Sequence, residues 1–67
     1  MTIFESHVWG VTQCIVSRVA RNVPPQTFVE ACEDARKIAL RQNFTKEEID
    51  AGILQARNWL TEDGYEL

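Results

Sequence analysis

A four-residue pattern, Thr-x-x-Glu, most constrains the fold of this chain, and it occurs three times in 67 residues. In such a capping box the threonine hydroxyl accepts a hydrogen bond from the backbone N–H three residues later, and the glutamate reaches back to the threonine N–H. The box starts a helix, because the first N–H groups of a helix have no partner within it. The pairs are Thr2 and Glu5, Thr27 and Glu30, and Thr45 and Glu48. Their recurrence predicts a helical chain.

Two breaks, at residues 22–25 and 43–45, divide the chain into three segments. Within each segment apolar residues recur at steps of three and four, the period of a helix. Pro25 suits the first turn of the second helix, because its missing N–H would have no intrahelical partner there. Asn43 and Gly64 suit the positions just past a helix end. The expected helices cover residues 3–21, 25–42 and 46–62.

The predicted fold class is an all-α single domain of three helices, in which helices two and three form an antiparallel hairpin and helix one packs across it. The first segment has poor helix propensity, because it contains Gly10 and many β-branched residues. A strand therefore stays open as the alternative for this segment. Phe44 is expected to staple onto Ile49, and Trp59 to lie at the core edge. The expected core residues are Phe4, Val8, Val11, Ile15, Val19, Phe28, Ala31, Cys32, Ala35, Ile38, Ala39, Ile49, Ile53, Ala56 and Leu60.

A chain of this size buries only about 60% of the surface that its unfolded form exposes, so help from a partner or a second copy is expected. Cys14 and Cys32 are isolated and have no metal-site spacing, which favours two reduced thiols, although the spacing leaves a single bridge open. Ten acidic and seven basic residues give a formal charge of −3. The sequence has no secretion signal and no run of about 20 apolar residues, so we expect a cytoplasmic protein without membrane contact.

Signs of catalysis are weak. His7 is the only histidine, and neither cysteine has a base partner in the sequence. The acidic residues come as adjacent pairs, which point in different directions on a helix. The three glycines are scattered and form no phosphate loop. We therefore expect a non-enzymatic protein with no catalytic, cofactor or metal site and no small-molecule substrate.

The segment NFTKEEIDAGIL, residues 43–54, admits two interpretations. It could be the turn and reading helix of a DNA-binding helix-turn-helix, or the hinge of a helical hairpin. Its first helical turns are acidic and would meet phosphate repulsion, which favours the hinge. The alternative of a nucleic-acid-binding regulator would need a dimer to gather the basic residues on one surface. Those residues are Arg18, Arg21, Arg36, Lys37, Arg41 and Lys46.

Several apolar residues fall outside the inward faces, at about 100° per helical residue. Contiguous apolar surface marks interaction sites, and tryptophan is a common hot spot. The main hypothesis is therefore a regulatory or accessory protein that binds a partner or itself as a homodimer, with Trp9 as the anchor. In size, acidity and helical content alone, the chain is similar to small accessory proteins of bacteria and their phages. The expected interface residues are Trp9, Val16, Ala20, Val29, Leu40 and Leu54.

Overall fold

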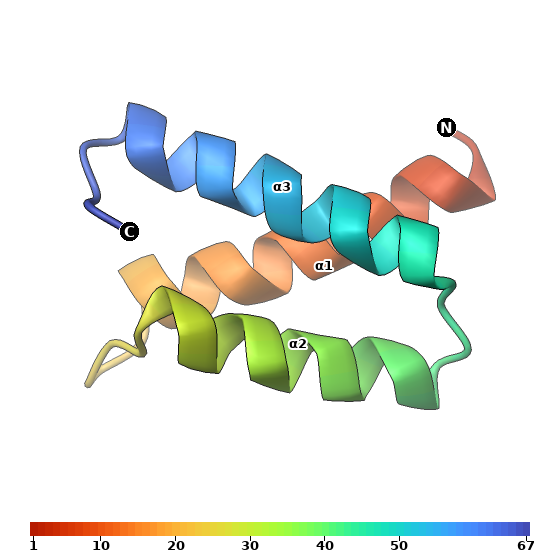
Figure 1. The fold of residues 1–67 in the computed structure, drawn as a ribbon, viewed down its shortest axis with the longest axis horizontal. Coiled ribbons are helices and arrows are strands. Elements are labelled where there is room, and N and C mark those ends of the chain that lie inside the picture. The colour runs from red at the N-terminus through yellow and green to blue at the C-terminus, as the bar shows by residue number, and fades with distance from the viewer.

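The computed structural model describes residues 1–67 and contains three helices and no strand (Figure 1). The helices are α1 (Ile3–Ala20), α2 (Phe28–Arg41) and α3 (Lys46–Glu62). The predicted all-α class is therefore confirmed, and the first segment is a helix and not a strand. None of the three helices is long and apolar enough to cross a membrane.

All three capping boxes form, with both of their hydrogen bonds present. At the second, the Glu30 N–H donates to the Thr27 hydroxyl at 3.2 Å, and the Glu30 carboxylate accepts from the Thr27 N–H at 3.0 Å. The prediction that Pro25 lies in the first turn of α2 is therefore wrong, because Thr27 caps the helix two residues later. Asn43, with φ of 62°, and Gly64, with φ of 95°, adopt the expected left-handed backbone past the ends of α2 and α3.

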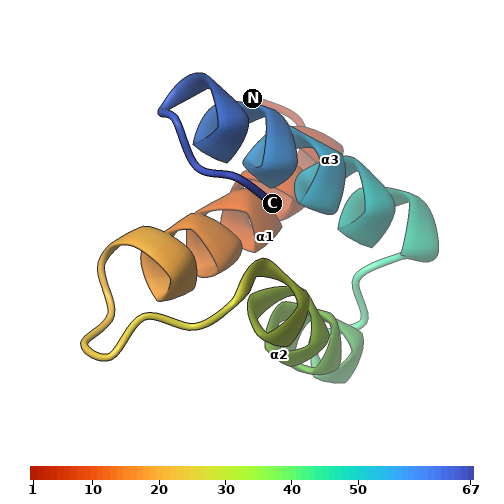
Figure 2. The ribbon, with the colours of Figure 1, turned by 60° about the vertical axis from the view of Figure 1, so that its left-hand side comes forward.

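The centre of the domain is α1, and α2 and α3 both lie on one side of it (Figures 1 and 2). α2 runs opposite to α3, as expected for consecutive helices joined by a short turn. However, α1 packs most extensively against α3 and next against α2, whereas α2 and α3 touch each other least. The two hairpin helices are thus held together mainly by their separate contacts with α1.

The contact between α1 and α3 is closest at Gly52. A Cβ atom built on Gly52 would lie 2.5 Å from the Cβ of Val11 and 3.1 Å from the carbonyl oxygen of Val8. Only a residue without a side chain allows this approach. Beside it, the fully buried Thr12 hydroxyl lies 2.8 Å from the Val8 carbonyl oxygen and 2.9 Å from the Gln55 Oε1, which satisfies its hydrogen bonding.

The core differs from the prediction most at Val16 and Phe4 of α1, whereas the predicted core residues Val8 and Ile38 are half-buried at its margin. Val16 is buried at 3% exposure, because α1 packs against two helices and buries a broad face: Val11 and Val16 lie about 140° apart around it. Phe4 is 47% exposed, because α1 crosses α3 obliquely and its first turn emerges beyond α3 (Figure 1). The buried apolar residues are Val11, Ile15, Val16, Val19, Ala31, Ala35, Ala39, Ile49, Ala56 and Leu60.

Candidate interaction surface

The largest exposed apolar side chains of α1 gather in its first nine residues. Ile3 is 75% exposed, Phe4 47% and Trp9 45%, and Met1 before the helix is 92% exposed. We call these four residues the Trp9 surface. Met1, Phe4 and Trp9 also line a shallow hollow of about 210 Å³, together with Gln55 of α3.

The Trp9 ring packs against a second tryptophan, Trp59 of α3. The ring centroids of Trp9 and Trp59 are 5.7 Å apart, with an angle of 39° between the ring planes. Trp59 is half-buried against the core at the edge of α3, as predicted. One side of the Trp9 ring is therefore packed and positioned, while nearly half of the residue stays exposed to solvent.

The Trp9 surface contains few charged side chains. Glu5, which also lines the hollow at Trp9, is the only Asp, Glu, Lys or Arg among residues 1–17. Its carboxylate accepts a hydrogen bond from the Thr2 N–H at 3.0 Å, and this bond to the backbone lowers the pKa of Glu5. The carboxylate thus already has a partner within its own helix cap.

Of the other predicted interface residues, the prediction for Val16 is wrong, because Val16 lies in the core at 3% exposure. Ala20, Val29, Leu40 and Leu54 are exposed as expected. They are not shown to form one patch with Trp9: Val29 and Leu40 lie on α2, about 16 Å apart along the helix axis. The hollow at Trp9 includes none of these residues.

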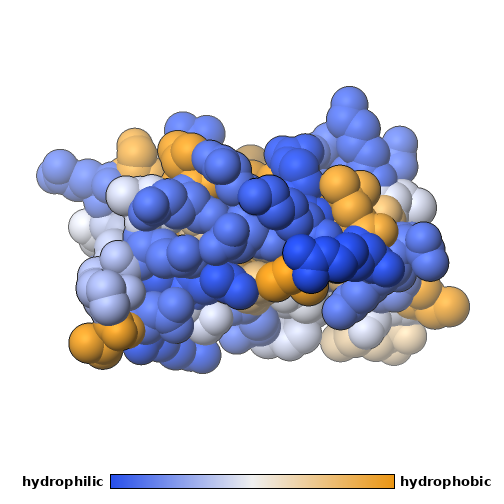
Figure 3. Space-filling model, turned by 90° about the horizontal axis from the view of Figure 1, so that it is seen from below, coloured by the Kyte–Doolittle hydropathy of each residue, from blue (hydrophilic) through white to orange (hydrophobic).

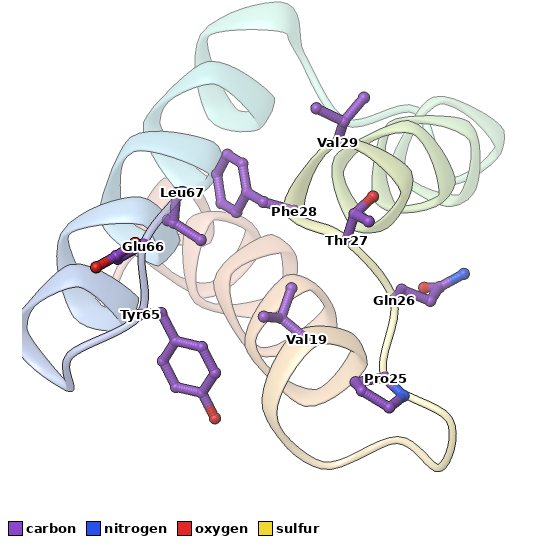
Figure 4. Close-up of a pocket in the computed structure, with 9 residues that line it drawn as sticks. All are labelled: Val19, Pro25, Gln26, Thr27, Phe28, Val29, Tyr65, Glu66 and Leu67. Carbon is purple, nitrogen blue, oxygen red and sulfur yellow. The ribbon is translucent and has the colours of Figure 1, made fainter.

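A second apolar region lies where the C-terminal tail returns over the ends of α1 and α2 (Figure 4). It is a hollow of about 450 Å³ lined mainly by Val19, Phe28, Val29, Tyr65 and Leu67. The ring of Phe28 points toward Leu67 in the close-up. The volume of this hollow exceeds that of the hollow at Trp9. Two of the residues that line it, Tyr65 and Leu67 of the C-terminal tail, are themselves exposed.

A neighbouring hollow of about 310 Å³ lies between α2 and α3, which pack little against each other. Its lining includes Phe28, Cys32, Arg36 and Ile53. Burial raises the pKa of the Cys32 thiol. Cys14 and Cys32 are both free.

Of the six predicted basic residues, Arg18 alone forms an ion pair. Arg18 is engaged within the fold: its Nη1 lies 3.2 Å from Asp34 Oδ2, and its Nε donates to Cys14 Sγ at 3.3 Å, a bond that raises the pKa of Arg18. The outer face of α2 is mostly hydrophilic, with separate hydrophobic spots (Figure 3). The other five predicted basic residues are exposed and form no ion pair: Arg21, Arg36, Lys37, Arg41 and Lys46.

One cluster was missed from the sequence. His7 Nδ1 lies 2.8 Å from Glu48 Oε2, and the His7 ring stacks on Phe44 with centroids 3.9 Å apart. The Thr45 N–H donates to the Glu48 carboxylate at 2.7 Å; this bond, helped by His7 and opposed by burial, lowers the pKa of Glu48. In the sequence, the capping box alone explains Glu48, and no local pattern predicts its contact with a histidine 41 residues away.

The chain matches no family model, no curated protein and no solved structure. No group of three or more His, Cys, Asp or Glu side chains could hold a metal ion. The feature of this molecule that most favours a function is the Trp9 surface.

Proposed function

We propose that this chain is a small non-enzymatic accessory or regulatory protein that binds another protein chain through the Trp9 surface. The observation that carries this proposal is the arrangement of Trp9, which Trp59 fixes on one side and which is 45% exposed. A positioned aromatic side chain loses little conformational freedom on binding, and tryptophan is enriched among the residues that contribute most to affinity.

The exposed area is large enough for such a role. Phe and Trp side chains each bury about 150–250 Å² when fully covered. From their exposed fractions, Met1, Phe4 and Trp9, which line the same hollow, present on the order of 350 Å² of mainly apolar area. Apolar patches of roughly 300–600 Å² are the largest on a typical monomer and are often functional.

The shortage of charge also favours a protein partner. Nucleic-acid binding takes most of its affinity from basic side chains that neutralise phosphates. The Trp9 surface offers none, and Arg18, one of the six residues of the nucleic-acid alternative, is paired with Asp34. A gel shift at low salt tests that alternative, because a phosphate-bound complex dissociates steeply as salt rises.

The test of the proposal compares three tagged proteins in quantitative affinity capture from a lysate of the source organism. The wild type should capture a protein that Trp9→Ala loses. Val23→Ala is the control, because Val23 is 97% exposed but lies in the loop between α1 and α2. Far-ultraviolet circular dichroism checks that each variant is folded. If nothing is captured in a manner that depends on Trp9, the proposal is wrong.

A further inference from the structure

A second hollow adjoins the Trp9 surface on the C-terminal half of α3. It has a volume of about 330 Å³, and we call it the Trp59 hollow. It shares Gln55 with the hollow at Trp9, and the centroids of the two tryptophan rings are 5.7 Å apart. A group bound in one hollow would therefore lie close to a group bound in the other. The residues that line the Trp59 hollow are Gln55, Asn58, Trp59, Glu62 and Asp63.

The Trp59 hollow is acidic, whereas the hollow at Trp9 is mainly apolar. Two of its lining residues, Glu62 and Asp63, carry carboxylates, and no Lys or Arg lines either hollow. Glu62 and Asp63 are both exposed, and neither forms an ion pair within the molecule. Both carboxylates are therefore free to pair with a cation that comes from outside the chain.

The same two carboxylates stand at the end of α3 where a helix favours a base. The C-terminal end of a helix carries partial negative charge, so a cation there is stabilising and an anion is destabilising. α1 has Arg18 in its last turn and α2 has Arg41, whereas α3 has no base there. Arg57, the last base of α3, precedes Trp59 by two residues and so projects about 160° away from it around the helix. Helix stability does not explain the acidic end of α3, whereas binding of a cation from outside would.

The tryptophan in the hollow indicates which cation fits. Guanidinium and ammonium groups are attracted to the face of an aromatic ring, most strongly to that of tryptophan. Arginine suits this hollow better than lysine, because its planar guanidinium stacks on the ring and donates two parallel hydrogen bonds to a carboxylate. A cavity of about 150 Å³ can hold a benzene molecule. The Trp59 hollow, at about 330 Å³, therefore has room for a guanidinium group.

We propose that the Trp59 hollow binds an arginine side chain of a different, partner protein, with the guanidinium stacked on Trp59 and paired with Glu62 or Asp63. This inference rests on the proposed function, since it states the chemistry of the partner segment that lies beside Trp9. Arginine is, with tryptophan and tyrosine, enriched among the residues that contribute most to affinity at interfaces. The complex should also weaken as salt rises, because ions screen an exposed charge pair.

Titration with N-acetylarginine amide, followed by nuclear magnetic resonance of the isotope-labelled protein, tests the hollow directly. The indole N–H resonance of Trp59 and the backbone amide resonances of Glu62 and Asp63 should shift and saturate. N-acetylcitrulline amide is the matched probe, because a neutral urea group replaces the guanidinium. At equal ionic strength it should leave these resonances nearly unchanged.

The double variant Glu62→Gln/Asp63→Asn removes both charges and nearly keeps the shapes of the side chains. It should bind the arginine amide at least about threefold more weakly, as expected when exposed charge pairs are lost. Glu47→Gln/Asp50→Asn is the control, because it changes the net charge equally at two exposed, unpaired residues near the start of α3, and it should bind like the wild type. Thermal melts verify folding, and Glu62→Gln/Asp63→Asn should be at least as stable as the wild type, since it removes negative charge from the end of α3.

Equal shifts with the arginine and citrulline amides would overturn the inference, as would an unshifted Trp59 or equal binding by the two double variants. Sedimentation velocity covers a second copy as the occupant: self-association of the wild type that Glu62→Gln/Asp63→Asn loses would assign the arginine to that copy and also overturn the inference. The proposed function fails in a different way. If a captured protein is lost in Trp9→Ala but kept in Glu62→Gln/Asp63→Asn, the arginine contact is excluded and binding through Trp9 stands.

Discussion

Gly52→Ala should destabilise the fold, although alanine is the better helix former. The new Cβ would lie 2.5 Å from both Cβ and Cγ1 of Val11, whereas ordinary contacts are 3.4–4 Å. Val11 Cβ cannot rotate away, so α1 and α3 must separate by about 1 Å at their closest point. Forced separation of packed elements costs typically 1–3 kcal/mol, and the gain in helix propensity offsets about 1 kcal/mol.

Because Val11 cannot move away, we expect a packing cost in the upper half of that range, about 2–3 kcal/mol. Subtracting the gain of about 1 kcal/mol in helix propensity leaves a net loss of about 1–2 kcal/mol of unfolding free energy. For a domain of this size, such a loss lowers the melting temperature by roughly 5–15 °C. Thermal unfolding followed by circular dichroism in dilute solution measures the shift. Gly10→Ala is the matched control, because the same substitution without a collision should stabilise the monomer by about 0.5–1 kcal/mol. If Gly52→Ala melts at or above the wild-type temperature, α1 and α3 do not approach as closely as described.

Two further predictions concern buried polar groups. Replacing the buried Thr12 by valine should cost about 1 kcal/mol, because the hydroxyl hydrogen that the Val8 carbonyl and Gln55 Oε1 can accept is lost. Urea unfolding measures this loss, and an unchanged midpoint would contradict the role of the hydroxyl. The pKa of Glu48 is lowered in the fold, so its stabilising contribution is present above its ordinary pKa of 4.5 and is lost as the pH falls through the folded value. Unfolding free energies measured between neutral and acidic pH should therefore fall less steeply in Glu48→Gln, and an identical slope in both proteins would refute this role.

Local sequence signals predicted the helix ends well. Each Thr-x-x-Glu box formed, because its hydrogen bonds join residues only three positions apart and require no distant contact. The range predicted for α3 equals the observed Lys46–Glu62. At α2 two local signals competed, and the capping box at Thr27 determined the start in place of Pro25.

The interaction surface was only partly predictable. Trp9 was singled out because it lies off the inward face of α1, and it is indeed exposed beside Trp59. Val16 lies at a similar angle, but it is buried because α1 packs against two helices at once. The width of a buried face depends on how many neighbours a helix has, and helical periodicity does not contain that number.

The sequence by itself determined three helices, their caps and the left-handed residues that end them, since each depends on interactions within a few residues. Only the tertiary structure decided that α1 is the central helix, that it crosses α3 at Gly52, and that His7 meets Glu48. These features depend on contacts between residues about 40 positions apart, which arise from the packing of whole helix faces. The same packing leaves the Trp9 surface exposed, and the proposed binding function rests on that surface.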